Sequence, residues 1–503
     1  MEQPLSARAS NVTQGLALHA RSSPGAPALL TPDREIGYGE LDALVWKSAG
    51  YLHRHGVRPG HVVALACVDE LASVLCLLAI ARLGATVFSI PRSATPYQRA
   101  ELASLAGIDF LASDRPERFD AGLPFVPADR QELTRDAPPV DPGIFCEAPL
   151  APWLLISGSG TTGRPKLIPV THAQEHARAS LASSWLGLGP ADRVASLSHF
   201  DFAHPKHRLL EVLNAGASFG LPRADEVYPV RLCRDMSITV LHMTVFHAEA
   251  LLAGLPAGGG HALPGLRALT IGASTVGDGL RERIRRRLCP NLIVRYATNE
   301  SGPVCVAGPP EVFAVPGTVG APLPGVQVQV VDGALRPLPP DVAGLIRIRG
   351  AGVVDGYRGD DEATRRAFRD GWFLPGDLGR LTRDGAQVHL GRADQLMIVN
   401  GINIYPAEIE RAMATHPAVR DVVAMPVPHA VHQDVPVCAV ALHQGMEASE
   451  QELQRHARER LGPRSPTRVF VFDEIPRSER GKPIRAELGR RIARRLGQRS
   501  AGT

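Results

Sequence analysis

The chain has 503 residues, 44% hydrophobic and 21% charged, a composition typical of globular enzymes of two or more domains. Lysine and arginine number 55 against 51 aspartates and glutamates, so the charge gives no reason to expect a nucleic-acid partner. The seven cysteines include no C-x-x-C pair, which favours reduced thiols in a cytoplasmic protein over a metal site. No signal peptide is visible in residues 1–19, and the most apolar span, 73–90, is too interrupted for a membrane helix.

Helical and strand patterns alternate over the first third of the chain. Apolar residues with helical spacing run from 41 to 52, and strands are predicted at 62–66 and 86–90 around a helix at 71–82. Such alternation predicts parallel sheets covered by helices. Residues 114–148 are rich in proline and acidic side chains, and we predict loops there.

The alternation returns after residue 166. The sequence predicts a helix at 172–186, a strand and a helix at 238–241 and 245–255, and further strands at 266–271 and 292–296. Short antiparallel strands are expected from 317 to 350. Near Gly391 the composition shifts to that of a small α+β unit, so we divide the chain into domains at 1–391 and 392–503.

A loop of serine, threonine and glycine follows a predicted buried strand at 153–156. Glycines let successive backbone N–H groups turn toward one anion, the hydroxyls add donors, and a lysine adds a positive charge. The sequence therefore predicts a polyphosphate site made by Ser159, Gly160, Thr161, Thr162, Gly163 and Lys166.

Three other interpretations of this loop were weighed. Gly158, Gly160 and Gly163 fit the G-x-G-x-x-G dinucleotide fingerprint, but Pro165 and Pro169 stand where its helix would begin. A Walker-type loop fails because two residues separate the last glycine from the lysine. A flexible linker stays open, although linkers rarely follow a buried strand and end in Pro-Lys.

The segment Ser159–Lys166 resembles the phosphate loop of the adenylate-forming superfamily, which contains acyl-CoA synthetases, amino-acid adenylation domains and luciferases. Other segments resemble that family's motifs in the family's order: 296–300, 371–379, 391–394, 400–410 and 475–485. The resemblance implies an α/β fold with a large N-terminal domain of parallel and mixed sheets, covering helices and a small β-barrel-like part. A small, mobile α+β C-terminal domain would follow, hinged near Asp394.

The resemblance also implies roles for individual residues. Lys482 would be the catalytic lysine, Asp377 would bind the ribose hydroxyls, and Arg392 would contact the ribose or phosphates. Glu300 and Thr162 would hold Mg²⁺. The nucleotide would also contact Gly272, Ala273, Ser274, Tyr296, Ala297, Thr298 and Asn299. The chain departs from the family's usual residues at Ala297, Asn299, Pro375 and Ser478.

The implied reaction is ATP-dependent activation of a small carboxylic acid to an acyl-adenylate, with release of pyrophosphate. The acyl group would then pass to the thiol of CoA or of a phosphopantetheinyl acyl or peptidyl carrier protein. The alternative is a stand-alone amino-acid adenylation enzyme that loads a carrier protein. We expect neither a nucleic-acid partner nor a membrane span, and a homodimer stays open.

A polar cluster after residue 198 is the candidate acyl pocket. It contains His199, Phe200, Asp201, His204, Lys206 and His207, with His242 further along the chain. A charged or hydroxylated substrate would suit these side chains better than a plain fatty chain. A polar surface loop is the alternative interpretation.

Overall fold

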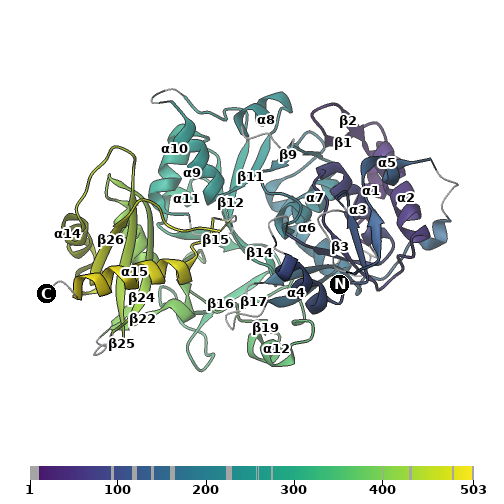
Figure 1. Ribbon diagram of the computed structural model, residues 1–503. Helices are drawn as coiled ribbons and strands as arrows, with labels where there is room; N and C mark the ends of the chain where they lie inside the picture. The colour runs from purple at the N-terminus through teal and green to yellow at the C-terminus, as the bar shows by residue number, and fades with distance from the viewer. Residues whose placement is uncertain are drawn as a thin grey trace.

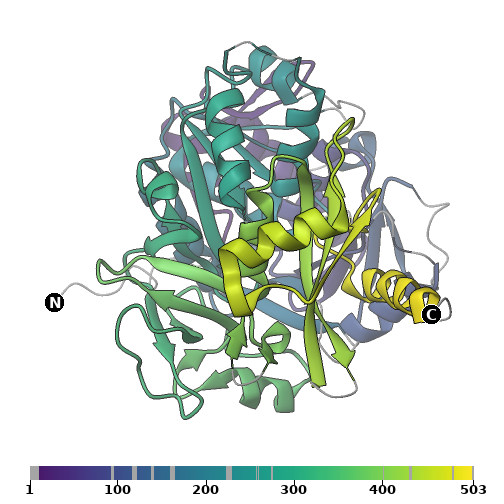
Figure 2. The same cartoon turned by 90° about the vertical axis from the view of Figure 1, so that its left-hand side faces the viewer.

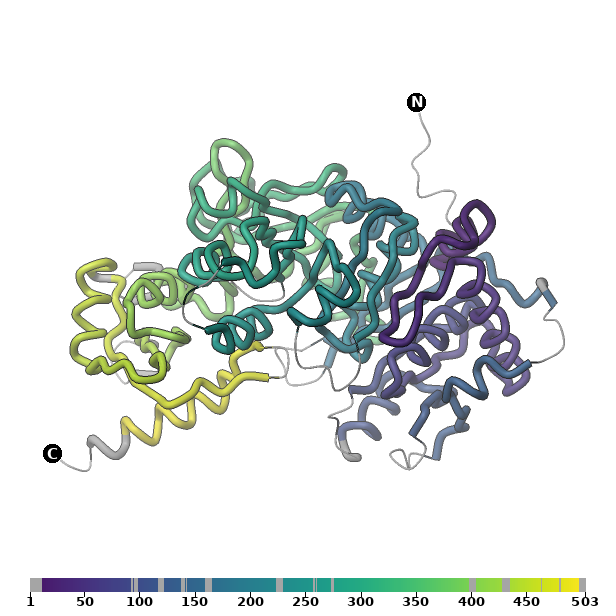
Figure 3. Tube along the Cα trace, turned by 90° about the horizontal axis from the view of Figure 1, so that it is seen from above, coloured from purple at the N-terminus to yellow at the C-terminus, as the bar shows by residue number. Residues whose placement is uncertain are grey.

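The computed structural model describes residues 11–91, 94, 96–115, 122–136, 141–158, 165–222, 229–256, 258, 260–272, 276–399, 402–429, 433–478 and 481–500. The chain forms a large N-terminal part and a small C-terminal part that lie side by side (Figure 1). Seen from above, the small part occupies one end of the molecule and the N-terminal helices occupy the other (Figure 3). None of the helices in the described ranges is long and apolar enough to cross a membrane.

The first sheet of the large part carries the predicted phosphate loop at its edge. Its order is β6-β5-β3-β4-β7-β8, and all neighbours are parallel except β7 and β8. The strands are β3 (Val62–Leu65), β4 (Thr86–Ser89), β5 (Phe110–Ser113), β6 (Phe125–Pro127), β7 (Pro152–Gly158) and β8 (Lys166–Thr171). Gly158 faces Lys166 across the antiparallel pair, so the loop connects two strands and does not open a helix. This excludes the dinucleotide-binding interpretation.

Within the described residues, five helices belong to the same part of the chain as this sheet, and the one at Glu70–Arg82 packs on β3 and β4. They are α1 (Gln14–Ser22), α2 (Tyr38–Arg54), α3 (Glu70–Arg82), α4 (Pro96–Ala106) and α5 (Arg130–Thr134). Every residue of α3 except Leu71 is buried, as its unbroken run of apolar side chains requires.

The prediction of loops throughout 114–148 was wrong. Strand β6 and helix α5 both fall in this segment, followed by a short 3₁₀ turn at Pro142–Ile144. The carboxylate of Asp129 caps α5 by accepting a hydrogen bond from the Glu132 N–H at 3.0 Å. Elements of three to five residues are too short to show a hydrophobic period. Their contacts with distant segments therefore determine whether they form a strand or a helix.

The second sheet is a long mixed sheet whose parallel half forms one wall of the candidate site. Its order is β18-β19-β17-β20-β21-β15-β14-β13-β12-β11-β9-β10-β1-β2, with β16 paired to β17. The parallel half contains β9 (Arg193–Ser196), β10 (Ser218–Gly220), β11 (Val240–Thr244), β12 (Ala268–Gly272) and β13 (Leu292–Thr298), and the edge pair is β1 (Pro27–Leu30) and β2 (Glu35–Gly37). The accompanying helices are α6 (His172–Leu186), α7 (Ala203–Ala215), α8 (Pro229–Asp235), α9 (Val245–Gly254) and α10 (Asp278–Arg287).

Beyond β13 the sheet becomes antiparallel, as predicted for 317–350. The strands of this half are β14 (Gly302–Ala307), β15 (Thr318–Pro322), β16 (Gln327–Val331), β17 (Gly344–Arg349), β18 (Phe368–Arg369), β19 (Trp372–Phe373), β20 (Asp377–Leu381) and β21 (Gln387–Arg392), with α11 (Glu311–Ala314) and α12 (Asp361–Ala367) between them. They form the small β-rich part expected of the large domain. Asp377 faces Arg392 across β20 and β21, which brings two predicted site residues together.

The small C-terminal part has α+β architecture, as predicted, and Figure 2 views the molecule from its side. Its elements are β22 (Met397–Val399), β23 (Ile402–Ile404), α13 (Pro406–Ala414), β24 (Val419–His429), β25 (Gln433–Leu442), α14 (Glu450–Leu461), β26 (Arg468–Phe472) and α15 (Arg485–Ser500). The two parts fit closely at Gly317, where a Cβ atom would lie 2.4 Å from Nη1 of Arg411. A side chain at this position would displace the end of Arg411, and the positive φ of 71° at Gly317 favours glycine.

Candidate functional site

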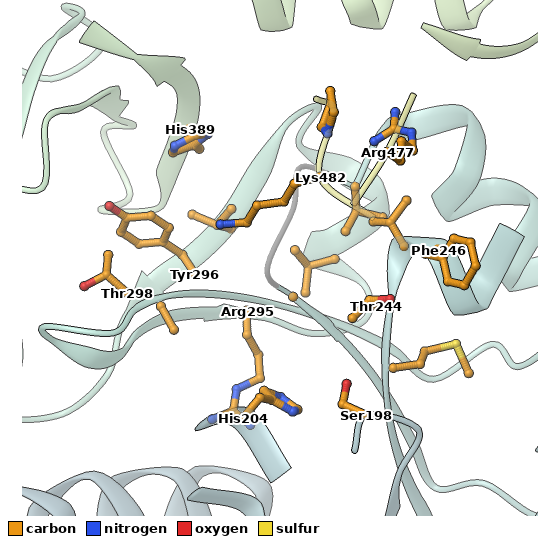
Figure 4. Close-up of a pocket in the computed structure, with 18 of the residues that line it drawn as sticks. Ser198, His204, Thr244, Phe246, Arg295, Tyr296, Thr298, His389, Arg477 and Lys482 are labelled. Atoms are coloured by element: carbon orange, nitrogen blue, oxygen red, sulfur yellow. The ribbon is translucent and has the colours of Figure 1, made fainter. Parts of the chain in front are cut away.

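A cavity of about 1520 Å³ lies where the two parts of the molecule meet. Its walls include Asp377 from the large sheet. Tyr296, also from the large sheet, and Lys482, from the C-terminal part, face the same cavity (Figure 4). The chain contains four lysines, Lys47, Lys166, Lys206 and Lys482. Three of these line the cavity, and Lys47 is the exception. The scarce lysines are therefore concentrated where a polyanionic ligand would be expected.

A hydrogen-bonded carboxylate stands at one end of the cavity. The Tyr296 hydroxyl donates to Oδ2 of Asp377 at 2.6 Å, and Arg392 Nη1 donates to Oδ1 at 3.1 Å. The ring of His389 lies 5.6 Å from the ring of Tyr296, and its Nε2 is 3.9 Å from Oδ2. Burial alone would raise the pKa of Asp377, but interactions with His389, Tyr296 and Arg392 outweigh it and lower the pKa. The carboxylate is thus held ionised, as an acceptor for hydroxyl groups.

Glu300 follows β13 and faces the hydroxyl of Tyr357, which donates to its Oε1 at 3.1 Å. The ammonium of Lys166 lies 4.5 Å from the centre of the Tyr357 ring, a cation–π contact. A carboxylate and a lysine thus approach the same tyrosine from two sheets. In the part of the chain that the structure describes, no three His, Cys, Asp or Glu side chains form a metal cluster. A metal ion at Glu300 would therefore need oxygen ligands from a bound nucleotide, an arrangement that suits Mg²⁺.

Arg178, which the sequence analysis missed, holds the loop that carries Glu300. Its buried guanidinium donates from Nε to the carbonyl of Gly352 at 2.7 Å. Its Nη2 donates to the carbonyls of Asn299 and Glu300 at 3.2 and 2.9 Å. The three acceptors lie more than 120 residues away along the chain. Because these bonds are long-range, nothing in the local sequence of α6 indicates this role.

Lys482 reaches the cavity from a tight turn before α15. The Ser478 N–H donates to the Lys482 carbonyl at 2.8 Å, and Gly481 has a φ of 73°. A Cβ atom on Gly481 would lie 2.8 Å from the Cβ of Phe246, so this glycine lets the turn approach α9 of the large part. In Figure 4 the Lys482 side chain points toward Tyr296 and His389. The turn and the phenylalanine together fix where the backbone of Lys482 lies.

The candidate acyl cluster also lies at the cavity, but on a buried helix. His204, Lys206 and His207 belong to α7, so the surface-loop interpretation is wrong for these three residues, whereas His199, Phe200 and Asp201 precede the helix. The Lys206 ammonium donates to the carbonyls of Phe200 and Phe202 and thereby closes the turn that begins the helix. Pro205 is tolerated because it lies in the first helical turn.

The remaining members of this cluster divide into two groups. His199 and Asp201 line the cavity, and His199 Nδ1 lies 3.1 Å from Glu70 Oε1. Phe200 packs against Phe219 in the core, and His242 is buried on β11 with its Nδ1 in contact with the Thr270 hydroxyl. These last two residues shape the wall from behind.

The structure describes some of the other residues that were predicted to contact the nucleotide, but not all of them. Gly272, Ala297, Thr298 and Asn299 line the cavity. Ser159, Gly160, Thr161, Thr162, Gly163, Ala273 and Ser274 lie outside the described residues. Asp394 lies in the 3₁₀ turn after β21, with its Oδ1 3.5 Å from Arg392 Nε, at the passage from the large part to the small one.

Comparison with known proteins agrees with this architecture. The family model "AMP-binding enzyme" matches residues 16–358, and the model of the AMP-binding enzyme C-terminal domain matches residues 408–482. Indoleacetate–CoA ligase of Aromatoleum aromaticum is 27% identical, over 95% of this chain and 97% of its own length. A 2-succinylbenzoate–CoA ligase of Geobacillus kaustophilus is 28% identical, over 92% of this chain and 96% of its own length.

Among solved structures, ATP-bound MatB from Rhodopseudomonas palustris superposes with a TM-score of 0.87. It is 22% identical in sequence, and the match covers 95% of this chain and 98% of that one. This likeness concerns the fold of both parts together. The first family model spans well over half of the chain, and the second spans most of the small C-terminal part. The chain therefore belongs to the family of AMP-binding enzymes.

Proposed function

We propose that this enzyme is an acid–thiol ligase. It activates a small carboxylic acid with ATP to an acyl-adenylate, releases pyrophosphate, and transfers the acyl group to the thiol of coenzyme A. The observation that carries the proposal is the approach of Lys482, from the C-terminal part, to the cavity that also contains Tyr296 and Asp377. Adenylate formation needs an ionised carboxylate that accepts hydrogen bonds from the ribose, and a lysine that reaches the same cavity from the C-terminal part.

The nucleotide binds across the two sheets. Asp377 accepts hydrogen bonds from the ribose hydroxyls, supported by its contacts with Tyr296 and Arg392. Lys166, at the start of β8, neutralises phosphate charge together with the loop at 159–164. Lys166 is the first residue of β8, directly after the loop that connects β7 to β8. The phosphates therefore extend away from Asp377 toward the first sheet.

Glu300 is the residue that would hold Mg²⁺, with Thr162 as a second oxygen ligand. A single protein carboxylate fits this ion, which commonly takes one or two carboxylates and completes its shell with phosphate oxygens and water. When bound, Mg²⁺ supplies positive charge to the phosphates. The Tyr357 hydroxyl orients the Glu300 carboxylate.

Lys482 acts on the reacting atoms. The substrate carboxylate and the α-phosphate are both anionic, so they repel each other until a cation stands between them. The ammonium of Lys482 bridges these groups while a carboxylate oxygen bonds to the α-phosphorus and pyrophosphate departs. Close packing of Gly481 on Phe246 supports this assignment because it places the backbone of Lys482 beside the cavity.

The second step requires the thiol to reach the acyl-adenylate. The small part, which we place at 392–503, rotates at Asp394 and withdraws Lys482 from the cavity. The position of Asp394 between β21 and β22 supports this hinge. A carrier-protein acceptor, a homodimer and a cytoplasmic location stay predictions, as does the alternative of an amino-acid adenylation enzyme.

The experiment is pyrophosphate–ATP exchange over a panel of carboxylic and amino acids, followed by addition of CoA and detection of the thioester by mass. We expect acid-dependent exchange and a CoA thioester with the same acid. Exchange without any CoA thioester would contradict the CoA-ligase assignment. Absence of exchange with every acid would contradict adenylation itself.

A further inference from the structure

Two buried arginines stand on the acyl side of the cavity. Arg208 belongs to α7 and Arg295 to β13, and both line the cavity. Arg208 is 5% exposed, and the side chain of Arg295 is 8% exposed. We call this pair, with the neighbouring rings of His204 and His242, the arginine cluster. Two guanidinium groups so far from bulk water need anionic partners.

The protein supplies only part of the required negative charge. Arg208 Nη2 and Arg295 Nη2 both approach Oε1 of Glu211, the second at 3.6 Å. Glu211 is buried behind the arginines and is not part of the cavity wall. Among the residues that the structure describes, Nε and Nη1 of Arg208 are buried without a hydrogen-bond partner. A buried charged donor without an acceptor is costly, so the cluster has room for an anionic ligand.

The other polar groups of the cluster are compatible with an anion. Burial and the charge of Arg208 lower the pKa values of His204 and His242, so both rings are neutral and can donate one hydrogen bond. One oxygen of the buried Glu175 carboxylate, Oε2, contacts His207 Nδ1 at 2.7 Å. Burial alone would raise the pKa of this carboxyl, but His207 and the charges of Arg178 and Arg208 lower it, so the carboxylate offsets part of the charge of these arginines. Asp201 is the acidic side chain on the same wall, and it favours an ammonium group as the competing occupant.

The anion would lie close to the reacting carboxylate. Arg295 immediately precedes Tyr296 on β13, and neighbouring residues of a strand point to opposite faces. Figure 4 shows this arrangement: Arg295 points toward His204, whereas Tyr296 lies on the side of Lys482 and His389. Arg295 and Lys482 line the same cavity, so one ligand can contact Arg295 with one end while its other end faces Lys482.

We propose that the substrate is a dicarboxylic acid. One carboxylate attacks the α-phosphorus of ATP and becomes the adenylate as pyrophosphate leaves. The other stays unreacted, accepting hydrogen bonds from Arg208 and Arg295. This inference rests on the proposed function and adds the substrate class to it. It also assigns Arg208 and Arg295 as the residues that determine specificity.

The test compares substrates of matched length on the wild-type enzyme. Malonate, succinate, glutarate and adipate are assayed by pyrophosphate exchange, each beside the monocarboxylate of the same carbon number, together with a set of amino acids. We expect kcat/KM to be at least about 30-fold higher for one of the diacids than for its matched monoacid, as a charge-assisted pair predicts. Exchange that is equal or better with monoacids or amino acids overturns the inference but supports adenylation. No exchange with any acid overturns the proposed function as well.

Variants then locate the second carboxylate. Arg295→Met should lower kcat/KM for the diacid by about 30-fold or more and leave the matched monoacid within about threefold. Arg295→Lys should recover part of the loss, because lysine restores the positive charge but cannot form the two parallel hydrogen bonds of a guanidinium. The control is Arg231→Met, whose side chain is 75% exposed on α8. Equal losses for both acids in Arg295→Met would overturn the assignment, and the wild-type panel decides the substrate class even if that variant does not fold.

Discussion

The hydroxyl of Tyr296 donates a 2.6 Å hydrogen bond to Oδ2 of Asp377, joining two strands whose residues are 81 positions apart. Burial and the neighbouring carboxylate raise the pKa of Tyr296 well above its usual value, so the phenol keeps its proton and remains a donor. The bond fixes one oxygen of the carboxylate while Arg392 fixes the other. The carboxylate of Asp377 is therefore held in a single orientation.

Removing this donor should weaken nucleotide binding. In Tyr296→Phe we expect KM for ATP to rise about tenfold, because a hydrogen bond to an ionised group is lost in a buried site. Steady-state kinetics with varied ATP measures the effect. Tyr38→Phe is the control, since that buried hydroxyl donates to the carbonyl of Ala217 at 2.7 Å, away from the cavity walls. An unchanged KM in Tyr296→Phe, or an equal rise in both variants, would contradict the role of this bond.

His172 should make stability depend on pH. Burial lowers its pKa to about 4, although Glu175 opposes the shift, and its Nδ1 accepts a hydrogen bond from the Val12 N–H at 3.1 Å. Because the pKa is lower in the folded state, the neutral ring of His172 contributes its full share to the free energy of unfolding above the unfolded pKa near 6.5. This contribution is lost as the pH falls from 6.5 toward 4. The difference corresponds to about 3 kcal/mol of unfolding free energy.

Urea unfolding at pH 7 and pH 5 tests this linkage. We expect the wild-type protein to lose more unfolding free energy between these values than His172→Asn, whose amide oxygen can still accept from Val12 but does not titrate. The comparison between the two proteins removes the contributions of other histidines. Parallel losses in both proteins would show that His172 is not the group responsible.

Asp394→Pro should separate the two half-reactions. Proline fixes φ, so rotation of the small part about this residue is restricted. We expect pyrophosphate exchange to stay within about threefold of wild type and thioester formation to slow by about tenfold or more. Asp394→Ala is the matched control, because it removes the carboxylate near Arg392 but leaves φ free. Equal loss of both half-reactions in Asp394→Pro, or equal slowing of transfer in both variants, would place the pivot elsewhere.

The long elements could be predicted from the sequence because their patterns are strong. Helix α6 begins and ends where predicted, since Thr171 caps it and Gly187 ends it in the left-handed conformation. The order of motifs also predicted that Tyr296, Asp377, Arg392 and Lys482 would meet, and all four line one cavity. Their roles in catalysis stay predictions for the experiments above.

The rest depends on contacts between distant segments. Arg178, Arg208 and Arg295 are arginines in ordinary helix and strand patterns, and only the packing of α6, α7 and β13 shows that they are buried. Helix α7 was missed because its first turn carries His204, Pro205 and Lys206, which are typical of loops. Lys206 stabilises the start of the helix because its ammonium donates hydrogen bonds to the carbonyls of the preceding turn, and this contact is visible only in the folded structure.

The most direct test of the account is Lys482→Ala beside Lys47→Ala, with both half-reactions measured. Lys47 is the lysine outside the cavity walls, and its ammonium pairs with Asp136 at 2.7 Å on the surface. We predict that Lys482→Ala lowers pyrophosphate exchange on the order of a hundredfold or more, whereas thioester formation from a supplied acyl-adenylate stays near wild type and Lys47→Ala changes neither step. Near-normal exchange in Lys482→Ala would contradict the central claim that this lysine brings the carboxylate and the α-phosphate together.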